Sequence, residues 1–251
     1  MKDSSPILRQ EDPTADVLLF DFDGTLCESG LSVIYGICRT TEHFGIHLTD
    51  TAGFFNCIGP TSRSTFSSAF GLSSKDLDLV VQLYRTAFRE EDIHRIALCP
   101  GIAEMLYMLC EAGKTSAIAT SKPMPHTVQI AAHFGILNWF VCVSGDRLDG
   151  KRSDKTSVIR KALLELTLNG AELNRCIMVG DRKYDVIGAS EVGIPCMGIS
   201  YGYGSRAELL VTDAVLGCRF RRRTPHRPFV VAIYFRDIIG YKNTACQRKL
   251  A

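Results

Sequence analysis

The sequence contains no apolar run that approaches the roughly 18 residues needed for a membrane-spanning helix. The amino-terminal stretch MKDSSPILRQEDPTAD is polar and carries acidic residues, which is not the composition of a secretory signal. These two absences argue against a membrane protein and against export. They predict a cytoplasmic protein with no membrane partner, in which residues 1–14 form a disordered lead-in.

The sequence also lacks paired cysteines, because none of its ten cysteines stands in C-x-x-C spacing with another. Several lie inside apolar runs, such as 140–143 and 176–179, where a thiol behaves as a small core residue. The pattern favours reduced cytosolic thiols over zinc ligands or disulfides.

The chain as a whole has little net charge, +2, because its 29 Lys and Arg residues nearly balance its 27 Asp and Glu residues. The end of the chain differs: from Cys218 onward there are nine Lys and Arg residues and one acid, so that this tail carries +8 and the remainder −6. The balance of the remainder predicts no nucleic-acid partner. The tail, residues 218–251, is either an arm for nucleic acids or anionic surfaces or, as its abrupt change of composition favours, an altered end of the chain.

Alternating apolar segments predict an α/β fold. Residues 17–20 form a short apolar run typical of a buried parallel strand, and residues 31–98 have mostly helical periodicity. Strands at 116–119, 140–143, 176–179 and 195–199 then alternate with helices. Strands separated by helices form a parallel sheet. We therefore expect a core of residues 15–27 and 99–217 with a helical insertion, residues 28–98, which we call the cap.

Polar residues follow four of the predicted strands, and in a parallel sheet the carboxyl ends of strands share one edge. They are Asp21 and Asp23 after the first strand, Thr120, Ser121 and Lys122 after the second, Lys155 beyond the third, and Asp181 and Asp185 after the fourth. Clustered carboxylates repel one another unless a cation joins them, and their oxygen atoms suit Mg²⁺. The predicted metal ligands are Asp21, Asp23, Asp181 and Asp185, and the predicted phosphate ligands are Thr120, Ser121 and Lys155.

Each assignment has a simpler alternative. Asp181 suits a helix cap, Asp185 a solvated helix position, and Lys122 or Lys151 competes with Lys155. Ser121 competes with Thr120 as the phosphate ligand. In the cap, Arg63 follows a Gly-Pro pair and is a candidate for binding a substrate anion, with an ordinary surface arginine as the equal alternative.

Four motifs in this order resemble those of the haloacid dehalogenase superfamily. They are DFDGTL at Asp21–Leu26, then Thr120, Lys155, and GDRKYD at Gly180–Asp185. The segments IGP at 58–60, ATSKP at 119–123, SDK at 153–155 and YGYGSR at 201–206 are similar to its phosphoglycolate phosphatase and 5′-nucleotidase-like branch. The resemblance covers about residues 17–215 and implies a Rossmann-like parallel sheet with a helical cap inserted after the first strand.

The resemblance also implies roles for these residues. Asp21 would be the nucleophile and a ligand of Mg²⁺, and Asp23 would be the acid/base, with its backbone carbonyl on the metal. Thr120 would hold the phosphate, Lys155 would stabilise both Asp21 and the phosphate, and Asp181 and Asp185 would complete the metal site.

The expected activity is Mg²⁺-dependent hydrolysis of a small phosphomonoester, such as phosphoglycolate or a nucleoside 5′-monophosphate, through an aspartyl phosphate. Phosphoryl transfer to a sugar phosphate or a protein tyrosine uses the same residues and is the main alternative. A carbon–halogen hydrolase would not need Asp23. A non-catalytic receiver-like protein would have neither the cap nor the pair of acids two residues apart.

Overall fold

The fold begins with the apolar run that the sequence marks as a strand, β1 (Val17–Phe20), all four residues of which are buried. The computed structural model describes residues 15–48, 52–70, 74–149, 154–212 and 215–216. The predicted lead-in 1–14, the tail 218–251 and Lys151 lie outside the described residues. Of the described helices, none has both the length and the apolar character needed to cross a bilayer.

The core is a six-stranded sheet in the order β5-β4-β1-β6-β7-β8, and every neighbouring pair is parallel. The predicted α/β fold with a parallel sheet is confirmed. The strands other than β1 are β4 (Thr115–Pro123), β5 (Val143–Asp146), β6 (Cys176–Gly180), β7 (Cys196–Gly198) and β8 (Val215–Leu216).

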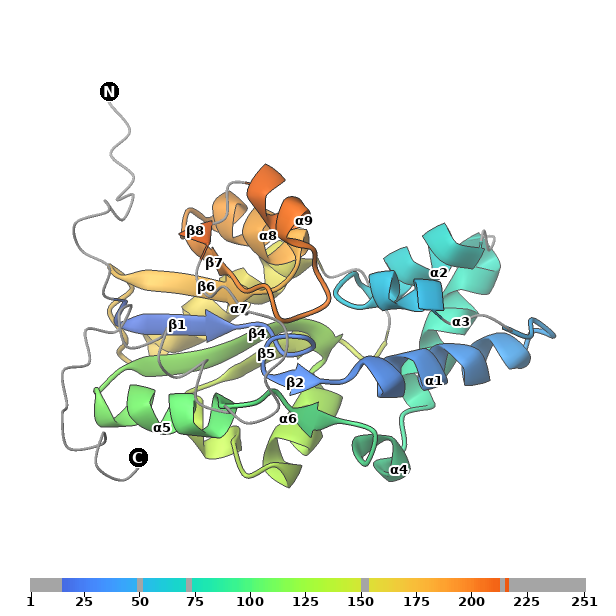
Figure 1. Ribbon diagram of the computed structural model, residues 1–251, viewed down its shortest axis with the longest axis horizontal. Helices are drawn as coiled ribbons and strands as arrows, with labels where there is room; N and C mark the ends of the chain where they lie inside the picture. Colours follow the sequence, from blue (N-terminus) through green and yellow to red (C-terminus); the bar gives the residue numbers. More distant parts are fainter. Residues whose placement is uncertain (1–14, 49–51, 71–73, 150–153, 213–214, 217–251) are drawn as a thin grey trace.

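Helices cover both faces of the sheet, and the alternation of side chains along β1 decides what each face buries. Leu18 and Phe20 pack with residues of α5 (Ile102–Glu111) and α6 (Met124–His133). Val17 and Leu19 pack on the other face with residues of α7 (Lys155–Leu168) and α8 (Lys183–Val192). Figure 1 shows this layering, with α5 and α6 on one side of the sheet and α8 and the short helix α9 (Arg206–Val211) on the other.

The cap lies beyond the carboxyl ends of the strands (Figure 1). The chain leaves the core through β2 (Cys27–Glu28) and returns through β3 (Ala97–Leu98), and these two strands pair antiparallel. A separate apolar cluster, which includes Ile37, Phe66 and Val81, forms the interior of the cap. The elements between the two strands are α1 (Gly30–Glu42), η1 (Ala52–Cys57), α2 (Ser62–Phe70), α3 (Ser74–Thr86) and α4 (Glu90–Ile93).

The third predicted strand is wrong in position. The sequence places it at 140–143, whereas β5 runs from Val143 to Asp146. Phe140 instead ends a short 3-10 helix, η2 (Leu137–Trp139), and contacts Phe20 with its ring edge. The real strand has a glycine at position 145 because it passes close to α6 there. A Cβ atom on Gly145 would lie 2.7 Å from Cα of Met124, so this position has no room for a side chain.

Candidate active site

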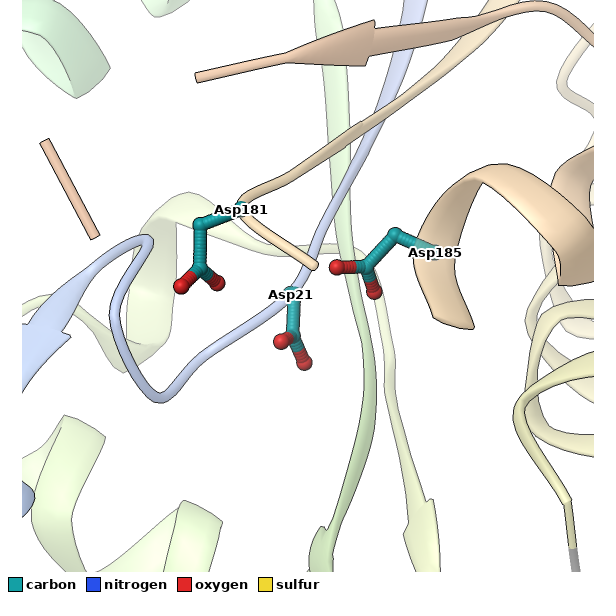
Figure 2. A group of neighbouring side chains, drawn as sticks. All are labelled: Asp21, Asp181 and Asp185. Atoms are coloured by element: carbon teal, nitrogen blue, oxygen red, sulfur yellow. The ribbon is translucent and has the colours of Figure 1, made fainter. Parts of the chain in front are cut away.

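Three predicted carboxylates converge at the carboxyl ends of neighbouring strands. Asp21 directly follows β1, Asp181 directly follows β6, and Asp185 lies in the first turn of α8. An oxygen atom from each lies within 4.8 Å of the other two, and Figure 2 shows Asp21 between Asp181 and Asp185. All three residues are buried, with exposed fractions of 3% or less. The order of the parallel strands therefore brings Asp21, Asp181 and Asp185 together, and we call these three residues the acidic group.

Burial makes the ionised forms of this group costly. Loss of water raises the pKa of Asp181 to about 8, and the charges of Asp185 and Asp21 add to the increase. Loss of water likewise raises the pKa of Asp185, to about 6, although the ammonium group of Lys155 opposes the shift. Three buried carboxylates so close together hold negative charge only when cations neutralise them.

Lys155 supplies one positive charge from the start of α7. Its Nζ lies 2.6 Å from Asp21 Oδ1 and 2.6 Å from Asp185 Oδ1. Burial by itself would lower the pKa of Lys155, but the carboxylates of Asp185 and Asp21 outweigh burial and raise it. The lysine is therefore a permanent cation between two of the three carboxylates, and it leaves Asp181 without a positive partner of this kind.

The donor set fits a hard divalent cation. Carboxylate oxygens are the ligands that Mg²⁺ prefers, and Mg²⁺ takes few of them. Asp21 Oδ1 is buried, and no donor among the described residues is aligned for a hydrogen bond with it, although Lys155 Nζ lies 2.6 Å away. A cation bound by Asp21, Asp181 and Asp185 would satisfy that oxygen and offset the repulsion among the three side chains.

Asp23, the fourth predicted carboxylate, lies outside this group. Its two carboxylate oxygens face Lys122, with Nζ at 3.0 Å and 3.2 Å. The predicted contact of the Asp23 backbone carbonyl with the metal stays a prediction, but the Asp23 side chain is not part of the acidic group. The reason is that Lys122, at the end of β4, is close enough to draw the Asp23 side chain to itself. The sequence analysis placed Lys122 at the end of the second predicted strand and as a competitor of Lys155, but it did not predict the contact with Asp23.

The predicted phosphate residues lie beside Asp21 and Asp23. Thr120 is buried near the end of β4, and its hydroxyl oxygen accepts a hydrogen bond from the backbone N–H of Lys122 at 3.2 Å. Thr120 and Ser121 line the same cavity as Asp21 and Asp23. The end of β4 thus places two hydroxyl groups and one ammonium group next to the first acidic motif.

This cavity lies between the core and the cap. The cap contributes residues of α1 and of the loop that follows η1, together with Phe66 and Tyr84. Phe88 and His126 also line it and stack on one another, with ring centroids 4.4 Å apart. These aromatic residues carry no sequence motif, so the sequence alone did not identify them.

Arg63 is placed differently from the prediction of a substrate-binding residue. Its guanidinium forms an ion pair with Asp78, whose side chain is 71% exposed, and Arg63 is not among the residues that line the cavity. Arg39 is the cap arginine that does line it, and it donates a hydrogen bond to Asp92 Oδ2 at 2.7 Å. A substrate-binding role for Arg63 has no support in this arrangement and stays a prediction.

Comparison with known proteins agrees with this geometry. The family described as haloacid dehalogenase-like hydrolase matches residues 18–199. The chain is similar to a 5′-nucleotidase of Pseudomonas aeruginosa, with 34% identity over 192 residues that cover 76% of this chain and 86% of that protein. It is similar to tyrosine-protein kinase PtkA of Mycobacterium tuberculosis, with 32% identity over 194 residues that cover 77% of this chain and 65% of that protein.

A solved structure, that of a predicted phosphatase from Clostridium acetobutylicum, has a TM-score of 0.75 and 31% identity, and the match covers 81% of this chain and 93% of that one. The expectation of an enzyme of the phosphatase type is confirmed by these similarities. The chain belongs to the haloacid dehalogenase-like hydrolases.

Proposed function

We propose that this protein hydrolyses a small phosphomonoester with the help of Mg²⁺, and that Asp21 is transiently phosphorylated. One observation carries the proposal: the Asp21 carboxylate belongs to the acidic group, contacts Lys155 and lines the cavity at the same time. A nucleophile, a phosphate site and a cation site therefore coincide. Asp21, Asp181 and Asp185 would hold Mg²⁺, and the bound ion would supply positive charge next to the phosphoryl oxygens.

The chemistry of the chain's own residues is a double displacement. An oxygen of Asp21 attacks phosphorus, the bond from phosphorus to the ester oxygen breaks, and Asp23 gives its proton to the departing oxygen. Asp23 then takes a proton from a water molecule as that water attacks phosphorus, which releases phosphate and restores Asp21. Thr120 holds phosphate oxygens, and Lys155 balances the charge that develops next to Asp21.

Asp23→Asn is expected to slow both halves of this reaction. The amide can neither give nor take the proton, so formation and breakdown of the phosphoenzyme should each slow by about 10²–10⁴-fold. Rapid-quench measurements of the two steps with labelled substrate test this. Asp16→Asn is the control, because Asp16 lies at the opposite edge of the sheet and pairs with Lys114. Wild-type rates for both steps in the Asp23 variant would remove it from the mechanism.

The cavity favours a nucleoside 5′-monophosphate over phosphoglycolate. Tyr84 and the stacked rings of Phe88 and His126 offer surfaces for a planar group. Phosphoglycolate needs a cation for its carboxylate, but the two cations lining the cavity, Arg39 and Lys122, already face Asp92 and Asp23. Burial lowers the pKa of His126 to about 4, so this residue is neutral near pH 7.

A substrate panel tests both levels of the proposal. With Mg²⁺ present, an aryl phosphate should be hydrolysed at a measurable rate. We expect kcat/KM for nucleoside 5′-monophosphates to exceed that for phosphoglycolate by about tenfold or more, since a buried group without a partner costs roughly 1–3 kcal/mol. A preference for phosphoglycolate would contradict the proposed preference for nucleoside 5′-monophosphates but would still agree with phosphatase activity. No hydrolysis of any ester would contradict the phosphatase proposal itself.

Phosphoryl transfer to a protein tyrosine is the second candidate, and the similarity to PtkA is the observation that favours it. The same phosphorylated Asp21 would pass its phosphoryl group to a tyrosine hydroxyl in place of water. Weak, uniform rates for all small esters, together with transfer of label from the phosphoenzyme to a tyrosine peptide, would favour this function.

A cytoplasmic location is part of the proposal. The eight cysteines within the described residues are all unpaired, as is usual for proteins of the reducing cytoplasm.

A further inference from the structure

Arg182 connects the acidic group to the cap. It lies between Asp181 and Asp185 in the sequence, and its backbone N–H donates a hydrogen bond to Asp185 Oδ2 at 3.0 Å. Its guanidinium points away from the acidic group, where Nη1 donates to the backbone carbonyl of Ile58 in the cap and Nε donates to Glu208 at 3.0 Å. The side chain is only 6% exposed, so these contacts are shielded from water.

The cap loop that follows η1 packs directly against the Arg182 side chain. Gly59 has a φ of +103°, which residues with side chains rarely adopt. A Cβ atom on Gly59 would lie 2.7 Å from Cγ of Arg182, so there is no space for one. Ile58 and Gly59 both line the cavity that contains Asp21. The position of Arg182 therefore fixes part of the cavity wall.

Tyr203, in the loop after β7, makes a similar pair of contacts with the acidic group and the cap. Its backbone N–H donates to Asp181 Oδ2 at 2.7 Å. Its hydroxyl oxygen accepts a hydrogen bond, at 2.6 Å, from the backbone N–H of Gly30, the first residue of cap helix α1. Its ring also stacks near Phe55 of η1, with centroids 6.1 Å apart. As with Arg182, the backbone holds a carboxylate and the side chain holds the cap.

We infer that Arg182 and Tyr203 are positioning residues that link cation binding at Asp181 and Asp185 to the position of the cap. The inference rests on the proposed function in taking the acidic group as the Mg²⁺ site. An ion that draws in these two carboxylates also fixes the backbone amides bonded to them, and thus the side chains that reach the cap. Because such linkage is reciprocal, a correctly placed cap also strengthens ion binding by the same factor.

A purely structural role makes a different prediction from a linking role. If the two residues only stabilise the fold, replacing them should loosen the cap equally with and without Mg²⁺. If they link the two sites, replacing them should reduce the extent to which Mg²⁺ slows amide exchange in the cap. The measurement that separates these outcomes is amide hydrogen exchange of α1 and residues 52–60, in the intact chain without substrate, at zero and saturating Mg²⁺.

The test variants are Arg182→Met and Tyr203→Phe, the second of which keeps the ring and the backbone amide and removes only the hydroxyl group that accepts from Gly30. In the wild type, Mg²⁺ should slow exchange in these cap segments by about fivefold or more. Each variant should lose most of that slowing, and calorimetry should show a weaker affinity for Mg²⁺. Slowing at the amides that begin α8 should persist, because the ion still binds there.

Arg85→Met is the matched control. Arg85, in cap helix α3, is 2% exposed and donates to Asp146 and to the carbonyl of Arg147 in the core, so it joins cap to core without touching the acidic group. This variant should exchange faster overall yet keep the full effect of Mg²⁺. If it lost the effect as completely as Arg182→Met, or if the Arg182 and Tyr203 variants kept it, the linkage would be refuted. Failure of the wild type to bind Mg²⁺ would overturn the metal site as well.

Discussion

Asp21→Asn should lose hydrolysis of every phosphate ester, by about 10⁴-fold or more, because an amide oxygen does not attack phosphorus as a carboxylate does. No neighbouring group can take over the role. Asp185 and Asp181 belong to the acidic group that we propose binds the cation, and Asp23 faces Lys122. Acid-quenched samples of the wild type with labelled substrate should contain a phosphoenzyme, and samples of the variant should contain none.

The fold of the Asp21→Asn variant should remain intact, which separates a chemical loss from a structural one. The substitution preserves shape and removes one buried carboxylate beside Asp181 and Asp185, while Lys155 keeps its contact with Asp185 at 2.6 Å. Without added cations, thermal unfolding of the variant should therefore occur at the same temperature as that of the wild type or higher. Wild-type turnover in this folded variant would show that the nucleophile lies elsewhere.

The parts of the site that lie on the sheet could be predicted because a parallel sheet imposes its own geometry. The apolar run of β1 predicts a buried strand, and strand ends in such a sheet share one edge. Asp21 and Asp181 follow adjacent strands, β1 and β6, so their proximity follows from the strand order alone. Asp185 joins them because one helical turn separates it from Asp181.

The parts that depend on contacts between the cap and the core could not be predicted. The sequence gives no means of knowing that Arg63 would pair with Asp78, or that Arg39 would reach the cavity. These outcomes depend on how α1, α2 and α3 pack, because the partners Asp78 and Asp92 lie 15 and 53 residues along the chain from the two arginines. The contact between Arg182 and the cap could not be predicted either. Its acceptor is the backbone carbonyl of Ile58, and backbone carbonyls are alike at every position in a sequence.

The third strand shows a limit of apolar patterns. The run at 140–143 is more apolar than the strand itself, which ends in Ser144, Gly145 and Asp146. Ser144 is buried because its hydroxyl donates to the carbonyl of Val158 in α7 at 2.7 Å, and Asp146 is buried because Arg85 pairs with it. Polar residues that find partners in distant elements are as compatible with a core strand as apolar ones.

Removal of divalent cations should abolish hydrolysis as completely as Asp21→Asn does, and added Mg²⁺ should restore it. With chelator present, the substrate phosphate would meet three buried carboxylates balanced by Lys155 alone, so both binding and reaction would be opposed by repulsion. Assays with an aryl phosphate, before and after exhaustive chelation, measure the effect. Full activity in the chelated protein would contradict the proposed metal site.

The same carboxylates predict how stability depends on pH when no cation is present. Burial, together with Asp185 and Asp21, raises the pKa of Asp181 from 3.8 to about 8, so between these values the folded state binds a proton that the unfolded state has released. This contribution to stability is complete below about pH 4 and is lost as the pH rises through 8. Asp185 adds a similar loss up to about pH 6.

Mg²⁺ competes with these protons, so it should raise the unfolding temperature more at pH 8 than at pH 5. Asp181→Asn should remove most of the decline in stability between pH 6 and pH 8, and most of the stabilisation by Mg²⁺. Asp16→Asn, at the far edge of the sheet, should change neither. Calorimetric unfolding of the wild type and the two variants at pH 5, 6 and 8, with chelator and with Mg²⁺, measures these effects. Equal stabilisation by Mg²⁺ at pH 5 and pH 8 would mean that the ion binds away from Asp181, because only a site that must lose a buried proton gains affinity across this range.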